Sequence, residues 1–201
     1  PQQVNYLLPA GLAKGRAVAA VWRNNEVLAA GALQINAVAP GLFTANANGQ
    51  GVPAAVAVRA APDGQQTFLP VAQFDAQQNR FVPLPLDFGG ADQQLYLVLF
   101  GSGVRYHGGL TSVSVQIGGL AAPLFFAGAQ GDLAGLDQLN VEVPKALAGR
   151  GVTTVNMAQV LGCMALPAAS GYVVTALAAP DGTTPEAAFR TVFGLLAVCN
   201  L

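Results

Sequence analysis

The chain has 201 residues, of which 53% are hydrophobic and only 9% are Asp, Glu, Lys or Arg, with a formal net charge of −1. This length allows one large domain or two small ones. The charge shows no basic stripe, which excludes the usual footprint of a nucleic-acid-binding protein. No apolar run reaches the roughly 18 residues of a membrane span. Soluble domains carry about 25% charged residues, so we expect other protein to cover much of this surface.

Short segments rich in β-forming residues follow one another along most of the chain. We expect strands at 17–22, 27–38, 52–60, 66–72, 79–86, 94–101, 111–118, 122–127 and 138–143. Turn residues separate them, for example Asn24-Asn25 and Gly118-Gly119. The alternation is clearest at 111–118, where Val113, Val115 and Ile117 would share one face. Short strands without helical periods between them predict a mainly β fold of antiparallel sandwiches.

The last fifty residues have a different pattern. Residues 184–186 (Thr-Pro-Glu) combine a capping residue, a proline and an acid, as at the start of a helix. Apolar residues at helical spacing follow, so we expect a short helix near 185–197. A weaker helical spacing runs over 157–164, and a strand remains open there.

The two ends of the chain bear on its compartment. The first residues are polar and are not typical of a signal peptide, and Pro1 is no translation start. We therefore expect the numbering to begin after processing or at an artificial boundary. The two cysteines, Cys163 and Cys199, fit one disulfide in an exported protein, and two buried thiols are the alternative. The disulfide predicts an extracellular or cell-surface location.

A phrase near the start of the chain returns near residue 136. PQQVNYLLPAGLAKGRA (1–17) is echoed by LDQLNVEVPKALAGRG (136–151). Matches at a constant offset of 135 residues (138 − 3) include Gln3 with Gln138, Asn5 with Asn140, and Pro9 with Pro144. Such a long-period echo predicts two related sandwich modules. We expect them at 1–88, where the module is incomplete, and at 89–201, with a linker near 87–93.

The echoed phrase has the pattern of a strand followed by a stop. In the second copy Leu139 and Val141 would face a core, while the Asn140 amide points away and bonds backbone groups of a turn. Pro144 removes a ladder donor and ends the pairing. We expect these amides to hold a loop rather than a ligand.

Five stretches together resemble a known family. They are QVNYLLPAGLAKGRA (3–17), INAVAPGLFTANANGQGVPAA (35–55), PVAQFDAQQNRFVPLPLDFG (70–89), YLVLFGSGVR (96–105) and the long stretch 117–151. Their order and wording resemble the Solibacter uncharacterised C-terminal domain family, found at the ends of large exported bacterial proteins. The resemblance implies immunoglobulin-like, IPT/TIG-type modules on or outside the cell, and it brings no catalytic residues. Residues 152–201 depart from the family's expected ending.

Few residues could carry chemistry. His107 is the single histidine, so a Ser-His-Asp or Cys-His site would have to use it. Its glycine neighbours predict an exposed loop histidine instead. A zinc site needs three or four His, Cys or acidic ligands, and the chain has only one histidine and two distant cysteines. Asp132 and Asp137 form the best carboxylate pair, at most a weak calcium site. We expect no metal, no cofactor and no enzymatic activity.

Three aromatic residues could form a platform for sugars. Trp22, Phe125 and Phe126 have the required rings, but we expect each of them to pack in a core.

The sequence leaves two functions to weigh beside an enzyme. The low charge favours a structural subunit of an extracellular assembly (filament, tube or layer) made of copies of itself. The alternative is a surface module that recognises glycan or protein for a larger exported protein. We expect the N-terminal segment to pair as a strand with another copy, as in donor-strand complementation. The contact residues of that segment are Gln2, Gln3, Val4, Asn5, Tyr6, Leu7 and Leu8.

Overall fold

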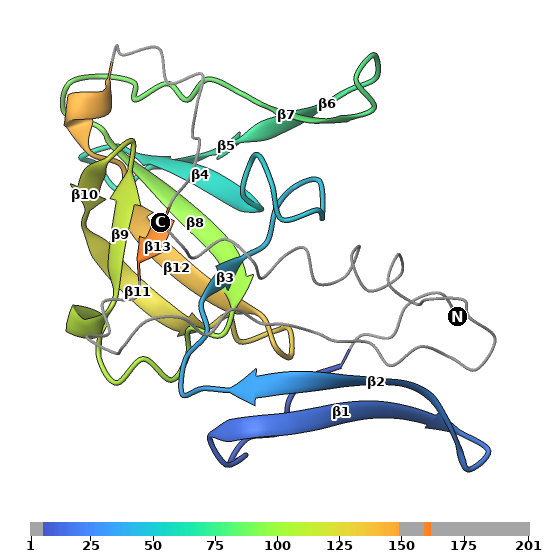
Figure 1. The fold of residues 1–201 in the computed structure, drawn as a ribbon. Coiled ribbons are helices and arrows are strands. Elements are labelled where there is room, and N and C mark those ends of the chain that lie inside the picture. The colour runs from blue at the N-terminus through green and yellow to red at the C-terminus, as the bar shows by residue number, and fades with distance from the viewer. Residues whose placement is uncertain (1–5, 149–158, 162–201) are drawn as a thin grey trace. The chain divides into compact units, whose positions relative to one another are not determined.

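A computed structural model describes residues 6–148 and 159–161 of the chain. The described part is mainly β, with antiparallel sheets, as the sequence predicts. The described residues divide between two compact units, one with residues 6–37 and the other with residues 38–148 and 159–161. Figure 1 labels the strands of both units.

The first unit contains β1 (Gly15–Arg23) and β2 (Glu26–Ile35). In the second unit the earlier strands are β3 (Gly41–Leu42), β4 (Ala55–Ala60), β5 (Gln66–Pro70), β6 (Ala72–Asp75) and β7 (Arg80–Pro83). The later strands are β8 (Gln94–Ser102), β9 (Ser114–Ile117), β10 (Leu120–Ala122), β11 (Leu124–Ala129), β12 (Asp137–Glu142) and β13 (Gln159–Leu161). Two short 3-10 turns are η1 (Leu110–Ser112) and η2 (Lys145–Leu147).

Strands β1 and β2 form an antiparallel hairpin. Asn24 and Asn25 connect them with φ angles of 49° and 68°, the left-handed pair that a tight hairpin turn needs. Asparagine tolerates this region better than most residues, which confirms the predicted turn. A bulge between Val21 and Trp22 shifts the register near the tip.

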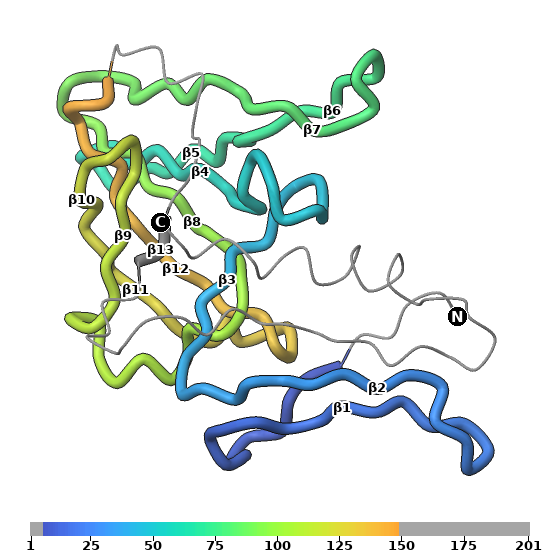
Figure 2. The backbone as a smooth tube through the Cα atoms, in the orientation of Figure 1, coloured from blue at the N-terminus to red at the C-terminus, as the bar shows by residue number. Residues whose placement is uncertain are grey.

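The second unit is built from two sheets and a hairpin (Figure 1). The larger sheet has the order β11-β12-β8-β4-β5, and β3 pairs with β8 beyond the end of β4. The smaller sheet has the order β10-β9-β13, and β6 pairs with β7. Figure 2 traces the path from β7 through residues 84–93 into β8.

One apolar core joins the two sheets of the second unit. Leu95, Leu97 and Leu99 of β8 are buried in it, and β9 contributes Val115 and Ile117. Residues two apart along a strand share a face, so this alternation places one face of each sheet inside. The predicted face of 111–118 is thereby confirmed. The result is an arrangement of the β-sandwich kind.

The predicted module boundary falls inside this unit. Strand β4 lies before residue 88 and β8 lies after it, yet the two pair from Ala55↔Leu99 to Ala60↔Gln94. Within residues 87–93, Ala91 and Asp92 form a turn, and the Gln93 side chain accepts a hydrogen bond from the Gly90 backbone at 3.0 Å.

The two copies of the echoed phrase have different structures. In the second copy Leu139 and Val141 are fully buried in β12, as predicted. Asn140 differs from the prediction, because its side chain accepts a hydrogen bond from the Gln138 amide at 2.8 Å instead of binding a turn. In the first copy residues 6–14 form no strand. Neighbouring strands β8 and β11 hold the second copy extended, so tertiary context decides the outcome.

The tail is described over three residues. Gln159–Leu161 is a strand that pairs with β9, so the weak helical spacing over 157–164 was misleading at these positions. Pairing with a free sheet edge outweighs a short apolar period. The predicted helix near 185–197 lies outside the described residues, as do Cys163 and Cys199.

Candidate functional site

The single histidine ties a loop to a sheet edge. His107 Nε2 lies 3.0 Å from the Ala127 carbonyl oxygen of β11, and Nδ1 accepts a hydrogen bond from the Gly109 backbone at 2.9 Å. The hydroxyl of Ser112 donates to the His107 carbonyl, not to the ring. His107 is half-buried, so the prediction of an exposed histidine was wrong. Its imidazole occupies the place of a strand partner at the open edge of β11.

The two candidate calcium ligands have separate roles. Asp137 is fully buried, and its carboxylate accepts from Arg105 Nε at 2.6 Å and from the Val104 backbone at 2.7 Å. Asp132 lies in the exposed loop before β12 and bonds Gln130. Because Arg105 already pairs with the buried Asp137 carboxylate, Asp132 and Asp137 do not offer two free carboxylates to one calcium ion. Within residues 6–148 no three His, Cys, Asp or Glu side chains come together.

All three aromatic residues expected in a core lie outside it. Trp22 is 62% exposed, Phe125 57% and Phe126 38%. Phe125 contacts Tyr96 edge to face, with ring centroids 5.8 Å apart. The prediction of core packing was wrong because alternation does not say which face of a strand is buried.

The outward side of the larger sheet forms an apolar surface, which we call the outer face. Its rows follow from the register: Val58 and Tyr96 lie opposite each other, and Val56 lies opposite Val98. On the two edge strands it carries Phe68, which is 68% exposed, and the pair Phe125 and Phe126. The other half-buried members from β8 and β12 are Gln94, Phe100, Ser102, Gln138, Asn140 and Glu142.

Charge is scarce on the outer face. Among its described strand residues Glu142 is the one charged side chain. An antiparallel sheet with one solvated face normally alternates apolar and polar residues. Apart from Arg59, Gln94 and Ser102 near the strand ends, this sheet is apolar on both sides along β4 and β8, which is typical of a surface that other protein covers.

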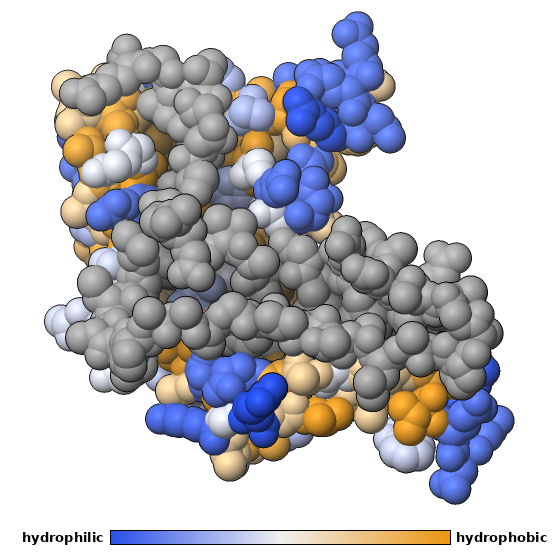
Figure 3. All heavy atoms as spheres, in the orientation of Figure 1, coloured by the Kyte–Doolittle hydropathy of each residue, from blue (hydrophilic) through white to orange (hydrophobic). Residues whose placement is uncertain are grey.

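The β1–β2 hairpin has its own apolar face. Val18 and Trp22 of β1 are exposed together with Val27 and Leu28 of β2, and Trp22 lies opposite Val27 in the register. Hydrophobic residues reach the surface in both units (Figure 3). No third strand joins this hairpin among the described residues.

The predicted contact segment is described in part. Tyr6, Leu7 and Leu8 are exposed and belong to no strand. Partial burial raises the pKa of the Tyr6 hydroxyl. The four preceding contact residues, Gln2 to Asn5, lie outside the described part of the chain.

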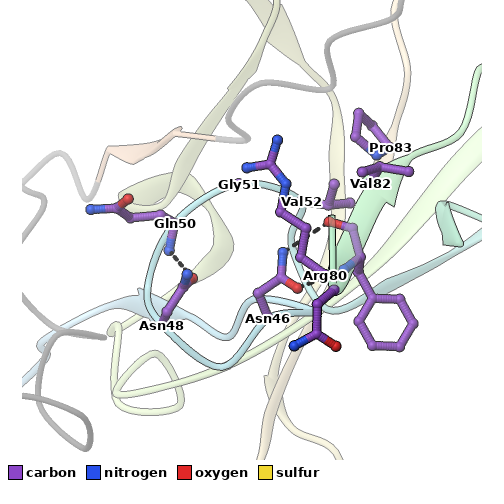
Figure 4. Close-up of a pocket in the computed structure, with 10 residues that line it drawn as sticks. Asn46, Asn48, Gln50, Gly51, Val52, Arg80, Val82 and Pro83 are labelled. Carbon is purple, nitrogen blue, oxygen red and sulfur yellow. Dashed lines mark hydrogen bonds between the residues drawn. The ribbon is translucent and has the colours of Figure 1, made fainter. Parts of the chain in front are cut away.

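A polar hollow lies between the β3–β4 connection and the β6–β7 hairpin (Figure 4). We call it the amide depression. It has a volume of about 410 Å³ and is lined by Asn46, Asn48, Gln50, Gly51, Val52, Asn79, Arg80, Phe81, Val82 and Pro83. The Arg80 side chain extends toward the loop at Gly51.

One amide joins the two walls of the depression. Asn46 Nδ2 donates to the Phe81 carbonyl at 2.9 Å, and the Phe81 backbone donates to Asn46 Oδ1 at 2.7 Å. The side chain thus pairs with β7 as a strand residue would. The Asn46 amide nitrogen and oxygen are both hydrogen-bonded to β7, so Asn46 links the two segments that line the hollow.

Sequence reasoning missed both new surfaces. Asn46 and Phe81 are 35 residues apart (81 − 46) and no spacing rule connects them. Phe68 lay in a predicted strand, but its apolar neighbour Leu69 made the outward side ambiguous. The clearest available signal was the excess of amides in residues 46–50 and 77–79.

Comparison with known proteins gives no relative: no family model, curated protein or solved structure matches the chain. Among the described residues no helix is long and apolar enough to cross a membrane.

Proposed function

We propose that the chain is a non-enzymatic structural subunit of an extracellular or cell-surface assembly built from copies of itself. The observation that carries this proposal is the outer face, where Phe68, Phe125 and Phe126 are exposed and Glu142 is the one charged side chain among the described strand residues of that face. Burying apolar surface contributes about 25 cal/mol per Å². A nearly neutral face selects neither an anionic nor a cationic partner, and a second copy offers the same chemistry.

Each unit contributes a different apolar surface. The second unit has the outer face, and the first has the exposed side of the hairpin around Trp22 and Val18. A contact between two different surfaces is head-to-tail, and such a contact need not close. A filament, tube or layer follows more naturally from this than a closed dimer.

Strand donation is a second source of adhesion. A lone two-stranded hairpin is marginally stable, and β1–β2 has no third strand among the described residues. The segment Gln2–Leu8 would add a strand to another copy, with main-chain hydrogen bonds as the adhesive.

The test is the sedimentation and electron microscopy of the purified chain over a range of concentrations. We expect ordered assemblies from the unchanged chain. Phe68→Lys and Phe125→Lys should each raise the concentration needed for assembly, because each buries a charge at the contact. Leu133→Lys is the matched control, since Leu133 is similarly exposed but lies in the loop between β11 and β12 and belongs to neither apolar surface. Dispersed monomers at every concentration, or equal effects of all three variants, would contradict the proposal.

A further inference from the structure

We propose that the amide depression binds an acidic carbohydrate, a sugar that carries a carboxylate. This inference is independent of self-assembly, because the depression uses no residue of the outer face. It rests on three features of the hollow: an arginine whose side chain hydrogen-bonds a neutral amide, several amides, and an apolar wall.

The arginine provides the charge. Arg80 donates through Nε and a terminal nitrogen to the Gln78 side-chain oxygen, at 2.9 and 2.5 Å. Neither ion pair of the described residues includes it, since these join Arg59 with Asp87 and Arg105 with Asp137.

The carboxylate opposite Arg80 in the hairpin already accepts hydrogen bonds from other groups. Asp75 lies opposite Arg80 across the hairpin and is attracted by its charge, but the hydrogen bonds of Asp75 come from the Gln77 and Gln78 backbones and from the Gln78 amide. The guanidinium keeps donors for an incoming group, and a planar carboxylate matches its fork.

The amides suit hydroxyl groups. Asn48 uses its oxygen for the Gln50 backbone, at 3.0 Å, and keeps its two amide hydrogens. The side chains of Gln50 and Asn79 line the hollow and make no hydrogen bond within the described protein. A sugar hydroxyl both donates and accepts, as an amide does.

The apolar wall suits the C–H face of a sugar ring. Val82 and Pro83 of β7 line the depression, and Val82 lies on the same side of the strand as Arg80 because side chains alternate. The Phe81 ring points to the other side, where it packs edge to face on Phe74 with centroids 5.5 Å apart. Both rings remain exposed. The volume of about 410 Å³ lies within the usual range of small-ligand sites.

The same features disfavour other anions. One arginine without neighbouring lysines gives little attraction for a polyphosphate or a nucleic acid. An acidic peptide could use the arginine and could also hydrogen-bond the amides through its backbone, so competition by tetraglutamate distinguishes it from a sugar.

Binding can be measured by equilibrium dialysis of labelled trigalacturonate against the whole chain, a method that works whether or not the chain assembles. The fully methyl-esterified trisaccharide tests the carboxylate, and tetraglutamate as a competitor tests for a peptide. The variant is Arg80→Gln. Its matched control is Arg59→Gln, which removes an arginine paired with Asp87 outside the hollow.

We expect trigalacturonate to bind, and Arg80→Gln and esterification each to weaken binding about 10- to 100-fold, the value of a charged hydrogen bond. Arg59→Gln should bind as the unchanged chain does. The proposal is overturned by equal losses in both arginine variants, by equal binding of the ester, by tetraglutamate competing as well as the sugar, or by no binding of trigalacturonate.

Discussion

Arg105 and Asp137 form a buried ion pair that joins the end of β8 to the start of β12. The Asp137 carboxylate, with no exposed surface, accepts from Arg105 Nε at 2.6 Å, while another guanidinium nitrogen donates to the Leu136 carbonyl at 2.9 Å. Two backbone N–H groups, of Val104 and Arg105, share the same carboxylate oxygen. The loop after β8 is thereby closed onto β12.

Asp137→Ala should lower the free energy of unfolding by about 3–5 kcal/mol, because it leaves a partly buried guanidinium and two backbone donors without an acceptor. Arg105→Ala should cost less, since the backbone donors still satisfy the carboxylate. Urea unfolding of both single variants and the double variant measures the coupling. Strictly additive effects would contradict a direct interaction.

Gly101→Ala should destabilise the second unit by about 3 kcal/mol, as overpacking does. A Cβ at this position would lie 2.2 Å from the Gly41 carbonyl oxygen, so β3 would have to move away from β8. Gly128→Ala is the control, because its Cβ would meet only the movable ring of Phe126 at 3.3 Å. Thermal unfolding compares them, and equal melting temperatures would show that β3 is loosely attached.

The β6–β7 hairpin should loosen in acid. Hydrogen bonds from the Gln78 backbone and side chain lower the pKa of Asp75. A lowered pKa in the folded state means that the carboxylate contributes stability above its unfolded value, about 3.9, and that this is lost as pH falls through the folded value. Asp75→Asn should remove this pH dependence from the amide exchange of residues 76–80. An unchanged acid response in Asp75→Asn would assign the effect to another group.

Deleting residues 1–8 should leave dispersed, unpolymerised protein, since the segment is the proposed donor strand. Replacing the same residues with a Gly/Ser segment of equal length separates strand pairing from mere chain length. Added synthetic peptide 1–8 should also limit growth by capping free sites. Assemblies that form equally well after the deletion would refute strand donation.

Cys163 and Cys199 should form a disulfide that closes a loop of about 36 residues (199 − 163) and stabilises the tail by roughly 3–4 kcal/mol. The mass of the unreduced chain should be lower by two hydrogens, and Cys199→Ser should abolish the difference. Two free thiols by titration of the unfolded chain would support the alternative of buried thiols.

The sequence predicted turns and the alternation within strands better than it predicted which strands pair with each other. Asparagine and glycine turns and the alternation around Val115 depend on near neighbours, so they can be recognised without the fold. Partners such as Arg105 and Asp137 are brought together by β8 and β12, whose pairing no local pattern specifies. The glycines at 89–90 suggested a linker because a turn and a linker have the same composition.

The candidate surfaces were harder to predict for the same reason. His107 was expected in solvent because its glycine neighbours gave no sign of the β11 edge beside it. Trp22 and Phe125 were expected in a core, since a large apolar side chain is usually buried. The low overall charge was the one sequence signal that pointed to covered apolar surface.

An apolar outer face also changes what holds the strands in alignment. A slip of one residue normally drives the buried set of a strand into solvent, and that penalty specifies the register. Along β4 and β8, where both sides are apolar, much of the penalty disappears. Asp137 supplies it instead, because a slip of β12 by one residue would carry its carboxylate away from Arg105 and place it on the apolar outer face. The buried Asp137 charge thus helps to fix the strand register of a sheet whose two faces are both largely apolar.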